Sequence, residues 1–289
     1  MKYLILGAKG QLGLEWTKRL SRENLAFTAT DYQELDISDT EAVALYLDEH
    51  KPDVVLNCAA YTNVDGAESD FKANNLLNHS APAAIAELCD AKGIVFVHYS
   101  TDYVFSGNIE DKQAYPLGYP IDAPVNPVNK YGEAKLMGEQ AIQQSGKNYL
   151  IIRIAWLCSA YGKNFMKTMI RFGSEKPKLT IVNDQFGSPT FTFDVVDATL
   201  RILQTPERGI FHVTTEGMYS WFDFANAIFN EAGIKVETEP VGSDAYPMVA
   251  KRPAYSKLDT SRFKKISGGV SYHMADGIKR VLSELNSSS

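Results

Sequence analysis

The sequence predicts an α/β protein in which a doubly wound parallel sheet is followed by a smaller C-terminal α+β subdomain. Over residues 1–157, short continuous apolar runs alternate with helical stretches, which is typical of parallel strands covered by helices on both faces. A glycine-rich turn joins the first apolar run to the first helix. Beyond residue 157 the alternation loosens, and Pro and Gly cluster at 187–189, 206–209 and 247–253.

The expected elements follow this alternation in order. Before residue 157 we expect strands over 3–6, 26–31, 53–60, 94–101 and 149–156, and helices over 11–22, 39–50, 79–93 and 131–146. The second of these helices begins with acidic residues and the third ends in glycine, as helix ends favour. Later helices are expected over 164–173, 193–204 and 220–233, with short strands over 179–182 and 209–214. The apolar residues of 220–233 lie on one helical face, which indicates core packing. We therefore divide the chain into a sheet domain (1–157), a subdomain interleaved with the sheet (158–285) and a frayed tail (286–289).

Composition excludes several classes of protein. The 289 residues are 45% hydrophobic and 22% charged with a net charge of -6, which is ordinary for a globular protein and disfavours nucleic-acid binding. The sequence contains no apolar run long enough for a membrane span and no signal-peptide pattern. Cys58, Cys89 and Cys158 lack the spacing of metal ligands, so we expect reduced, mostly buried thiols and a cytoplasmic protein.

Three glycines follow the first expected strand. Gly7, Gly10 and Gly13 lie between that strand and the first helix, where a tight turn needs residues without Cβ. Backbone N–H groups at such a helix start can bind an anion, which is how a dinucleotide pyrophosphate is held. The spacing is G-x-x-G-x-x-G rather than G-x-G-x-x-G, and a purely structural turn is the alternative.

Two charged residues bear on the choice of cofactor. Asp31 ends the second expected strand about 20 residues after the glycines, where a carboxylate can bind the ribose 2′-hydroxyl of NAD(H). Lys9 stands inside the glycine turn, where a cation could meet the 2′-phosphate of NADP(H). The residues alone leave both cofactors open.

A tyrosine and a lysine occupy one face of an expected helix. Tyr131 and Lys135 are four residues apart in "YGEAK". A phenol is a weak acid at neutral pH, and a nearby ammonium would lower its pKa. Such a pair suits a ketone reductase, in which the phenol protonates the alkoxide as hydride arrives. A surface pair without function is the alternative.

Six motifs resemble one family throughout the chain. "GAKGQLG", "CAAYTNVDGAE", "STDYVFSG", "YGEAK", "FGSPT" and "RPAYSKLD" are similar to motifs of the extended short-chain dehydrogenases/reductases, and in particular of the dTDP-4-dehydrorhamnose reductase family, over residues 2–285. The resemblance implies a Rossmann-type NAD(P)-binding domain over 1–157 and a sugar-nucleotide-binding subdomain over 158–285. It also implies reduction of dTDP-4-dehydro-L-rhamnose to dTDP-L-rhamnose, a polysaccharide precursor, by a monomer or homodimer that uses NADP(H) or NAD(H).

The resemblance also assigns roles by position. Thr101 would bond the substrate carbonyl, Tyr131 would be the general acid, and Lys135 would bind the nicotinamide ribose and tune Tyr131. Asn78 would support the site. The implied cofactor residues, with Lys9 and Asp31, are Gly7, Gly10, Gln11, Leu12, Gly13, Asp36, Ile37, Ala59, Ala60, Tyr61, Tyr131 and Lys135. The implied substrate residues are Val64, Asp102, Tyr103, Trp156, Gln185, Pro189, Thr190 and Arg252.

Other functions of similar proteins compete with this one. A sugar-nucleotide 4,6-dehydratase would carry Asp-Glu after the catalytic threonine, whereas Asp102 is followed here by Tyr103. An epimerase shares the Thr/Tyr/Lys set, and the regulatory subunit of methionine adenosyltransferase is a similar protein that acts through binding. Residues 157–160 depart from the family pattern beside the expected sugar pocket. His79, His98 and His212 lack partners at ligand spacing, so we predict no metal site built by protein side chains.

Overall fold

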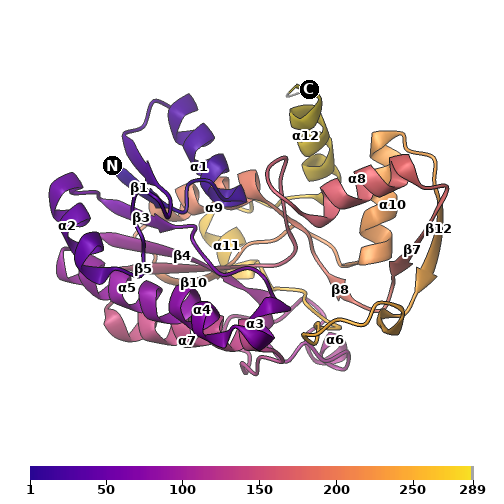
Figure 1. Cartoon of the computed structure of the whole chain (residues 1–289), viewed down its shortest axis with the longest axis horizontal. Helices are drawn as coiled ribbons and strands as arrows, with labels where there is room; N and C mark the ends of the chain where they lie inside the picture. Colours follow the sequence, from indigo (N-terminus) through magenta and orange to yellow (C-terminus); the bar gives the residue numbers. More distant parts are fainter. Residues whose placement is uncertain (288–289) are drawn as a thin grey trace.

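A parallel sheet forms the centre of the computed structural model, which describes residues 1–287 (Figure 1). Among these residues the strand order is β10-β5-β4-β3-β1-β2, with every neighbouring pair parallel. Strand order reverses between β1 and β3, the position at which doubly wound sheets open a crevice for ligands. The expected fold class is therefore confirmed. The strands are β1 Tyr3–Leu6, β2 Phe27–Thr30, β3 Val54–Asn57, β4 Val95–Thr101, β5 Tyr149–Ile154 and β10 Gly209–His212.

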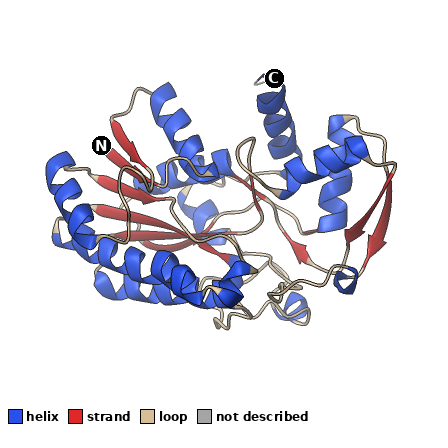
Figure 2. Cartoon of the chain, viewed as in Figure 1, coloured by secondary structure: helices blue, strands red, loops and turns tan. Residues whose placement is uncertain are grey.

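Helices cover both faces of this sheet (Figure 2). Tyr3 and Ile5 of β1 pack into one core with α1, α9 and α11, whereas Leu4 and Leu6 pack into another with α2, α5 and α7. Alternating side chains of one buried strand thus serve two helical layers, which explains why the strand is apolar throughout. The helices are α1 Gln11–Arg22, α2 Thr40–His50, α5 Ala81–Ala91, α7 Lys130–Ser145, α9 Thr192–Leu203 and α11 Ser261–Ile266.

The crossover after β3 is longer than the sequence suggests. Short helices α3 (Gly66–Ser69) and α4 (Phe71–Asn75) lead into a π-helical turn, η1 (Leu76–Ser80), that continues directly into α5. The expected helix over 79–93 therefore begins too late. Its start was obscured because polar residues dominate this stretch, and the π turn breaks their helical periodicity.

The remaining elements lie to one side of the sheet, around α8 and α10 (Figure 1). Strands pair here in short two-stranded sheets: β7 with β12, β8 with β11, and β6 with β9. The bounds are β6 Leu157–Cys158, α8 Phe165–Glu175, β7 Lys178–Val182, β8 Phe186–Gly187, β9 Thr190–Phe191, β11 Tyr219–Ser220, α10 Trp221–Ala232, β12 Glu237–Val241 and α12 Met274–Ser287, with short turns η2 Asp102–Val104, α6 Asp111–Ala114 and η3 Ser243–Ala245.

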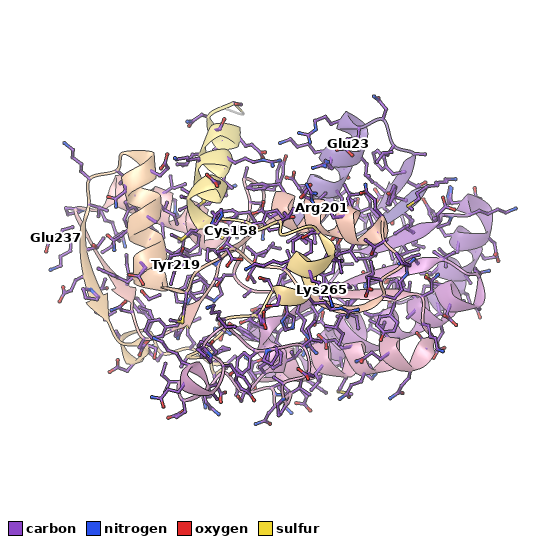
Figure 3. All side chains as sticks on the ribbon, turned by 180° about the vertical axis from the view of Figure 1, so that it is seen from behind. Glu23, Cys158, Arg201, Tyr219, Glu237 and Lys265 are labelled. Atoms are coloured by element: carbon purple, nitrogen blue, oxygen red, sulfur yellow. The ribbon has the colours of Figure 1, made fainter. Side chains whose placement is uncertain are left out.

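The C-terminal helix is part of the packed structure. Figure 3 shows Cys158 in the interior, where it packs with Phe191, Ile278 and Val281. Because α12 runs to Ser287, residues 286 and 287 are helical where a frayed tail was predicted. Residues 288 and 289 of that predicted tail lie outside the described part of the chain.

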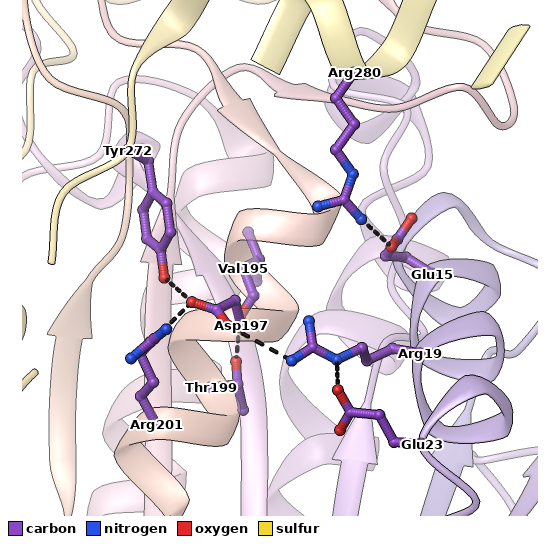
Figure 4. A network of polar contacts seen from close by, with 9 residues as sticks. All are labelled: Glu15, Arg19, Glu23, Val195, Asp197, Thr199, Arg201, Tyr272 and Arg280. Atoms are coloured by element: carbon purple, nitrogen blue, oxygen red, sulfur yellow. Dashed lines mark hydrogen bonds and ion pairs between the residues drawn. The ribbon is translucent and has the colours of Figure 1, made fainter. Parts of the chain in front are cut away.

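A polar network ties α12 and α9 to α1 (Figure 4). Asp197 accepts hydrogen bonds from Arg201 Nε at 2.6 Å and from the Tyr272 hydroxyl at 2.8 Å. Arg280 of α12 reaches Glu15 of α1 at 3.6 Å. These contacts join the later part of the chain to the first helix of the sheet layer. Within residues 1–287, the helices are too short or too polar to cross a membrane.

Candidate active site

A cavity of about 750 Å³ opens at the carboxyl ends of β1, β2, β3 and β4. It extends from the glycine turn to the start of α7 and to Trp156 and Trp221. Most of the residues singled out from the sequence meet here, although they come from many separate segments. Those that line it are Gly7, Lys9, Gly10, Gln11, Leu12, Asp31, Asp36, Ile37, Ala59, Ala60, Val64, Thr101, Asp102, Tyr103, Tyr131, Lys135 and Trp156.

The glycine turn has the shape of an anion cradle. Gly7 has φ +77°, and a Cβ there would lie 2.7 Å from the backbone nitrogen of Ala59. A Cβ on Gly13 would lie 2.2 Å from the carbonyl oxygen of Gly7, so this glycine lets α1 pack on the turn. Gly10 caps α1 without a side chain, which leaves the first N–H groups of the helix open to a ligand. The cradle therefore fits a dinucleotide pyrophosphate.

Charged side chains surround the position after β2. Asp31 accepts the Lys9 backbone N–H at 2.9 Å and the Tyr32 N–H at 2.9 Å. The Lys9 ammonium pairs with Glu34 at 3.2 Å, and this hydrogen bond is the main reason that the pKa of Glu34 is lowered. Glu34 also accepts the Asp31 N–H at 3.0 Å. The Lys9 ammonium, which could attract a 2′-phosphate, is thus already paired with a carboxylate.

Thr101 and Tyr131 form a hydroxyl pair on the cavity wall. Thr101 ends β4, and Tyr131 lies in the first turn of α7, where the Asn129 side chain caps the helix by accepting the Gly132 N–H at 2.8 Å. The pKa of Tyr131 is raised to about 12, mainly by burial and also by the Asp102 carboxylate, while the hydrogen bond with Thr101 opposes the rise. A neutral phenol at neutral pH is a proton donor, as a general acid must be.

The Lys135 ammonium is held against β4, and its expected tuning of Tyr131 stays a prediction. Its Nζ donates to the Tyr99 carbonyl at 2.6 Å and lies 3.0 Å from His98 Nε2. The side chain is only 1% exposed, and burial lowers its pKa to about 8. The described groups that shift the Tyr131 pKa are Asp102 and Thr101. Lys135 nevertheless lines the cavity, where it can meet a ribose.

Asp102 connects the hydroxyl pair to the C-terminal part of the chain. Its carboxylate accepts hydrogen bonds from Thr101 Oγ1 at 3.1 Å and from Ser256 Oγ at 2.5 Å. Burial raises its pKa to about 6, while the two hydroxyl donors oppose the rise. The Tyr103 ring meets the Tyr131 ring edge-on at 5.7 Å. Together these groups hold Thr101 in one orientation.

Some of the residues expected at the site do not line the cavity. Asn78 braces the segment after β3 by donating to the Tyr61 carbonyl at 2.9 Å, so Tyr61 contributes backbone, and Gly13 lies behind the turn. Gln185 accepts a hydrogen bond from the Trp221 indole N–H at 3.1 Å. Pro189 and Thr190 are buried, and the Thr190 hydroxyl donates to the Ala155 carbonyl at 2.6 Å.

Arg252 has one occupied and one free side to its guanidinium. Nη2 donates to Asp65 at 2.8 Å, whereas Nη1 is buried and has no hydrogen-bond partner among residues 1–287. A buried donor without an acceptor is costly, and a ligand oxygen would satisfy it. Arg252 lies close enough to Tyr103 to lower the pKa of that phenol, which burial raises. It is therefore the strongest anion ligand among the expected residues away from the cavity wall.

The structure adds cavity residues that the sequence did not reveal. Trp221 stacks on Trp156 with ring centroids 3.5 Å apart, although its helix pattern suggested only core packing. Lys163 lines the cavity, and its carbonyl accepts a hydrogen bond from Gln11 at 3.4 Å. The loop around Ser159 thus packs on the glycine turn as well as beside the expected sugar pocket. The "YGKNF" stretch was the only signal for Lys163.

No cluster of three or more His, Cys, Asp or Glu side chains suited to a metal ion occurs within residues 1–287. Cys58, Cys89 and Cys158 are free thiols, and burial raises the pKa of each. A thiol with a raised pKa is a poor nucleophile. The acid–base side chains that line the cavity within residues 1–287 carry hydroxyl, carboxyl and ammonium groups.

Comparisons with known proteins show the family of this chain. A family model described as "RmlD substrate binding domain" matches residues 1–287. A dTDP-4-dehydrorhamnose reductase of Burkholderia thailandensis is 39% identical over 93% of each chain. The solved structure of a dTDP-4-dehydrorhamnose reductase from Clostridium acetobutylicum is 37% identical, with a TM-score of 0.93 over 99% of this chain and 100% of that one. The enzyme of that name from Bacillus anthracis, solved in complex with NADP, is 34% identical, with a TM-score of 0.92 over 98% of this chain and 99% of that one. This chain therefore belongs to the dTDP-4-dehydrorhamnose reductase family of NAD(P)-dependent oxidoreductases.

Proposed function

We propose that the protein reduces the C4 ketone of dTDP-4-dehydro-L-rhamnose to give dTDP-L-rhamnose, a precursor of surface polysaccharides. The observation that carries this function is the Thr101–Tyr131 hydroxyl pair, which lies in the same cavity as the glycine cradle. The family membership and the relatives named for this reaction support the choice of sugar.

The residues of the chain suggest how the reaction is assisted. The nicotinamide cofactor, when bound, supplies the hydride. The glycine turn and the open N–H groups of α1 would hold its pyrophosphate, and Lys135 would bond its ribose. When the substrate is bound, the Thr101 hydroxyl would turn its single O–H from Asp102 to the ketone oxygen, and Tyr131 would transfer its phenolic proton to that oxygen as the alkoxide forms.

The sugar nucleotide would lie between the hydroxyl pair and the C-terminal segment. The free Nη1 of Arg252 is suited to a diphosphate oxygen, and its opposite side is fixed by Asp65. The stacked Trp156 and Trp221 rings give the cavity a flat apolar wall. Gln185, Pro189 and Thr190 would act from behind this wall by supporting the residues that touch the substrate.

A dehydratase is disfavoured by the composition of the site. Eliminating water from the sugar would need a further acid or base beside Asp102, and the next residue is Tyr103, whose phenol has a pKa raised by burial. An epimerase and a non-catalytic binding subunit are the other candidates. An epimerase would convert the sugar without net oxidation of the cofactor. A binding subunit would bind the cofactor without turnover.

The test is cofactor oxidation with enzymatically generated dTDP-4-dehydro-L-rhamnose, followed separately with NADH and NADPH. Wild-type protein is expected to oxidise one or both, and Tyr131→Phe to lower kcat at least about 100-fold while cofactor affinity is kept. Tyr46→Phe, on α2 away from the cavity, is the matched control. Wild-type protein that binds cofactor but never oxidises it with this sugar would contradict the proposed function.

We also propose a compartment and an oligomeric state for the protein. Three free thiols suit a reducing compartment, so we place the protein in the cytoplasm. Its partner is the dTDP-sugar substrate, and the protein would work as a monomer or homodimer. Sedimentation at micromolar concentration would distinguish these two states.

A further inference from the structure

A chain of buried polar side chains runs behind the cavity from β3 through β4 to α7. Lys135 Nζ lies 3.0 Å from His98 Nε2, and His98 Nδ1 lies 3.1 Å from the Asn57 side-chain amide. The exposed fractions of Asn57, His98 and Lys135 are 1%, 0% and 1%. Polar groups this deeply buried are retained only when each finds a partner, so the direction of every hydrogen bond in the chain can be worked out.

Proton positions follow from the lysine. An ammonium can only donate, so His98 Nε2 must accept from Lys135 and the imidazole proton must lie on Nδ1. Burial and the Lys135 charge hold the pKa of His98 well below its usual range, which keeps the ring neutral. The Nδ1–H then needs an acceptor, and Asn57 Oδ1 is buried without a partner among residues 1–287. Turning the Asn57 amide brings this oxygen onto the Nδ1–H.

The chain of hydrogen bonds limits what the ammonium can do. Of its three N–H donors, one goes to His98 and one to the Tyr99 carbonyl. One N–H is left, on a residue that lines the cavity. We infer that Asn57 and His98 are positioning residues, which keep Lys135 protonated and aim its remaining N–H at the cofactor ribose. This inference deepens the proposed function and rests on it for the role of Lys135.

Other charged groups near Lys135 raise its pKa or reduce that rise. Glu139, one turn further along α7, favours the ammonium, but Arg153 of β5 pairs with that carboxylate at 2.7 Å and reduces its effect. Tyr131 lies one turn earlier on α7, and burial keeps its phenol neutral. The Tyr99 phenol and the Cys58 thiol on the neighbouring strands also have pKa values raised by burial. The Tyr99 carbonyl and His98 are therefore the neutral acceptors that directly support the charged lysine, and His98 is the one that a side-chain substitution can remove.

The first experiment replaces His98, whose Nε2 accepts the hydrogen bond from Lys135, in two ways. His98→Phe removes it, and His98→Gln restores an oxygen acceptor in a similar volume. His98→Phe is expected to lower the pKa of Lys135 by about one unit, the effect of losing one hydrogen bond to a charged donor. We would measure dissociation constants for NADH and NADPH by protein fluorescence from pH 6 to 9. In His98→Phe they should begin to rise at a pH about one unit lower than in wild type.

The controls separate positioning from folding. His98→Gln should restore most of the wild-type pH dependence, and His50→Phe at the end of α2 should leave it unchanged. Thermal unfolding of each variant shows whether it folds. If His98→Phe folds and its affinity for the cofactor weakens at the same pH as that of wild type, the inference is overturned. Because cofactor binding needs no sugar, this result is independent of whether the proposed substrate is reduced.

The second experiment observes the tautomer directly. Nitrogen-15 NMR of the imidazole rings, with His98→Gln used to assign the resonance, should show the proton of His98 on Nδ1. Asn57→Leu should weaken that tautomer and shift the pH dependence of cofactor binding in the same direction as His98→Phe. Finding the proton on Nε2 in wild type would overturn the inference, because His98 would then donate to Lys135 rather than accept.

Discussion

Replacing Asp102 by asparagine is expected to make the protein more stable at neutral pH and less active. The carboxylate is 4% exposed, and its compensating contacts are the hydroxyls of Thr101 and Ser256. Burial raises its pKa from 3.8 to about 6. The folded protein therefore binds this proton more tightly than the unfolded chain, so the contribution of Asp102 to stability falls as pH rises from 3.8 to about 6.

The size of the effect follows from the pKa shift. A rise from 3.8 to about 6 corresponds to about 3 kcal/mol of destabilisation once the group is ionised. Asparagine keeps the shape and carries no charge, so Asp102→Asn should raise the unfolding free energy by up to about 3 kcal/mol at pH 7.5 and by less than about 1 kcal/mol at pH 4. Its kcat should fall about tenfold, because the Thr101 hydroxyl then bonds a neutral amide oxygen instead of a carboxylate and is oriented less firmly.

Urea unfolding at both pH values would measure this difference. Asp122→Asn, at an exposed position, is the matched control and should change neither the stability nor its pH dependence. A stability difference between Asp102→Asn and wild type that is equal at pH 4 and pH 7.5 would refute the argument. So would a variant that is destabilised at pH 7.5 and fully active, since the carboxylate would then stabilise the fold without serving the site.

The remaining predictions concern the core and the cofactor. Glu139→Leu leaves the buried Arg153 guanidinium without the carboxylate that pairs with it at 2.7 Å, and it should lower the unfolding free energy by about 3–5 kcal/mol. The double variant Glu139→Leu/Arg153→Met should recover most of this loss. If urea unfolding shows a loss below about 1 kcal/mol for the single variant, the prediction is contradicted. Glu34→Gln frees the Lys9 ammonium and should strengthen binding of 2′,5′-ADP about two- to fivefold relative to 5′-AMP by calorimetry. Glu49→Gln on α2 is the control, and an unchanged ratio would exclude a role for this ion pair in cofactor choice.

Local patterns were enough to predict the sheet and the glycine cradle. The apolar residues of β1 and the glycines after it are adjacent in sequence, and their structure depends on strand burial and on freedom at φ +77°. The helical spacing of Tyr131 and Lys135 placed both residues on the cavity wall. The spacing could not show that Lys135 turns toward β4, because His98 and the Tyr99 carbonyl that attract it lie more than 30 residues earlier.

Features that depend on distant pairs were missed. Trp221 looked like a core residue because its helix is apolar on one face, yet stacking on Trp156 brings its ring to the cavity. Trp156 itself has φ +49°, a conformation that no pattern predicts for tryptophan. The buried places of Pro189 and Thr190 follow from the pairing of β9 with β6, which brings together residues about 30 positions apart. Short strands of two residues carry too little periodicity to be predicted.

Contacts across the boundary near residue 157 argue that the two parts of the chain form one catalytic unit. The Gln11 side chain, at the start of α1, accepts hydrogen bonds from Ser159 at 2.9 Å and from Asn164 at 3.0 Å. Ser256 donates to the carboxylate of Asp102, which in turn orients Thr101. The later part of the chain therefore braces both the cofactor cradle and the proton-donating pair. Because Gly162, Lys163 and Trp221 of the later part also line the cavity, the sheet domain supplies only part of the cavity wall and only part of the contacts that position its reactive groups.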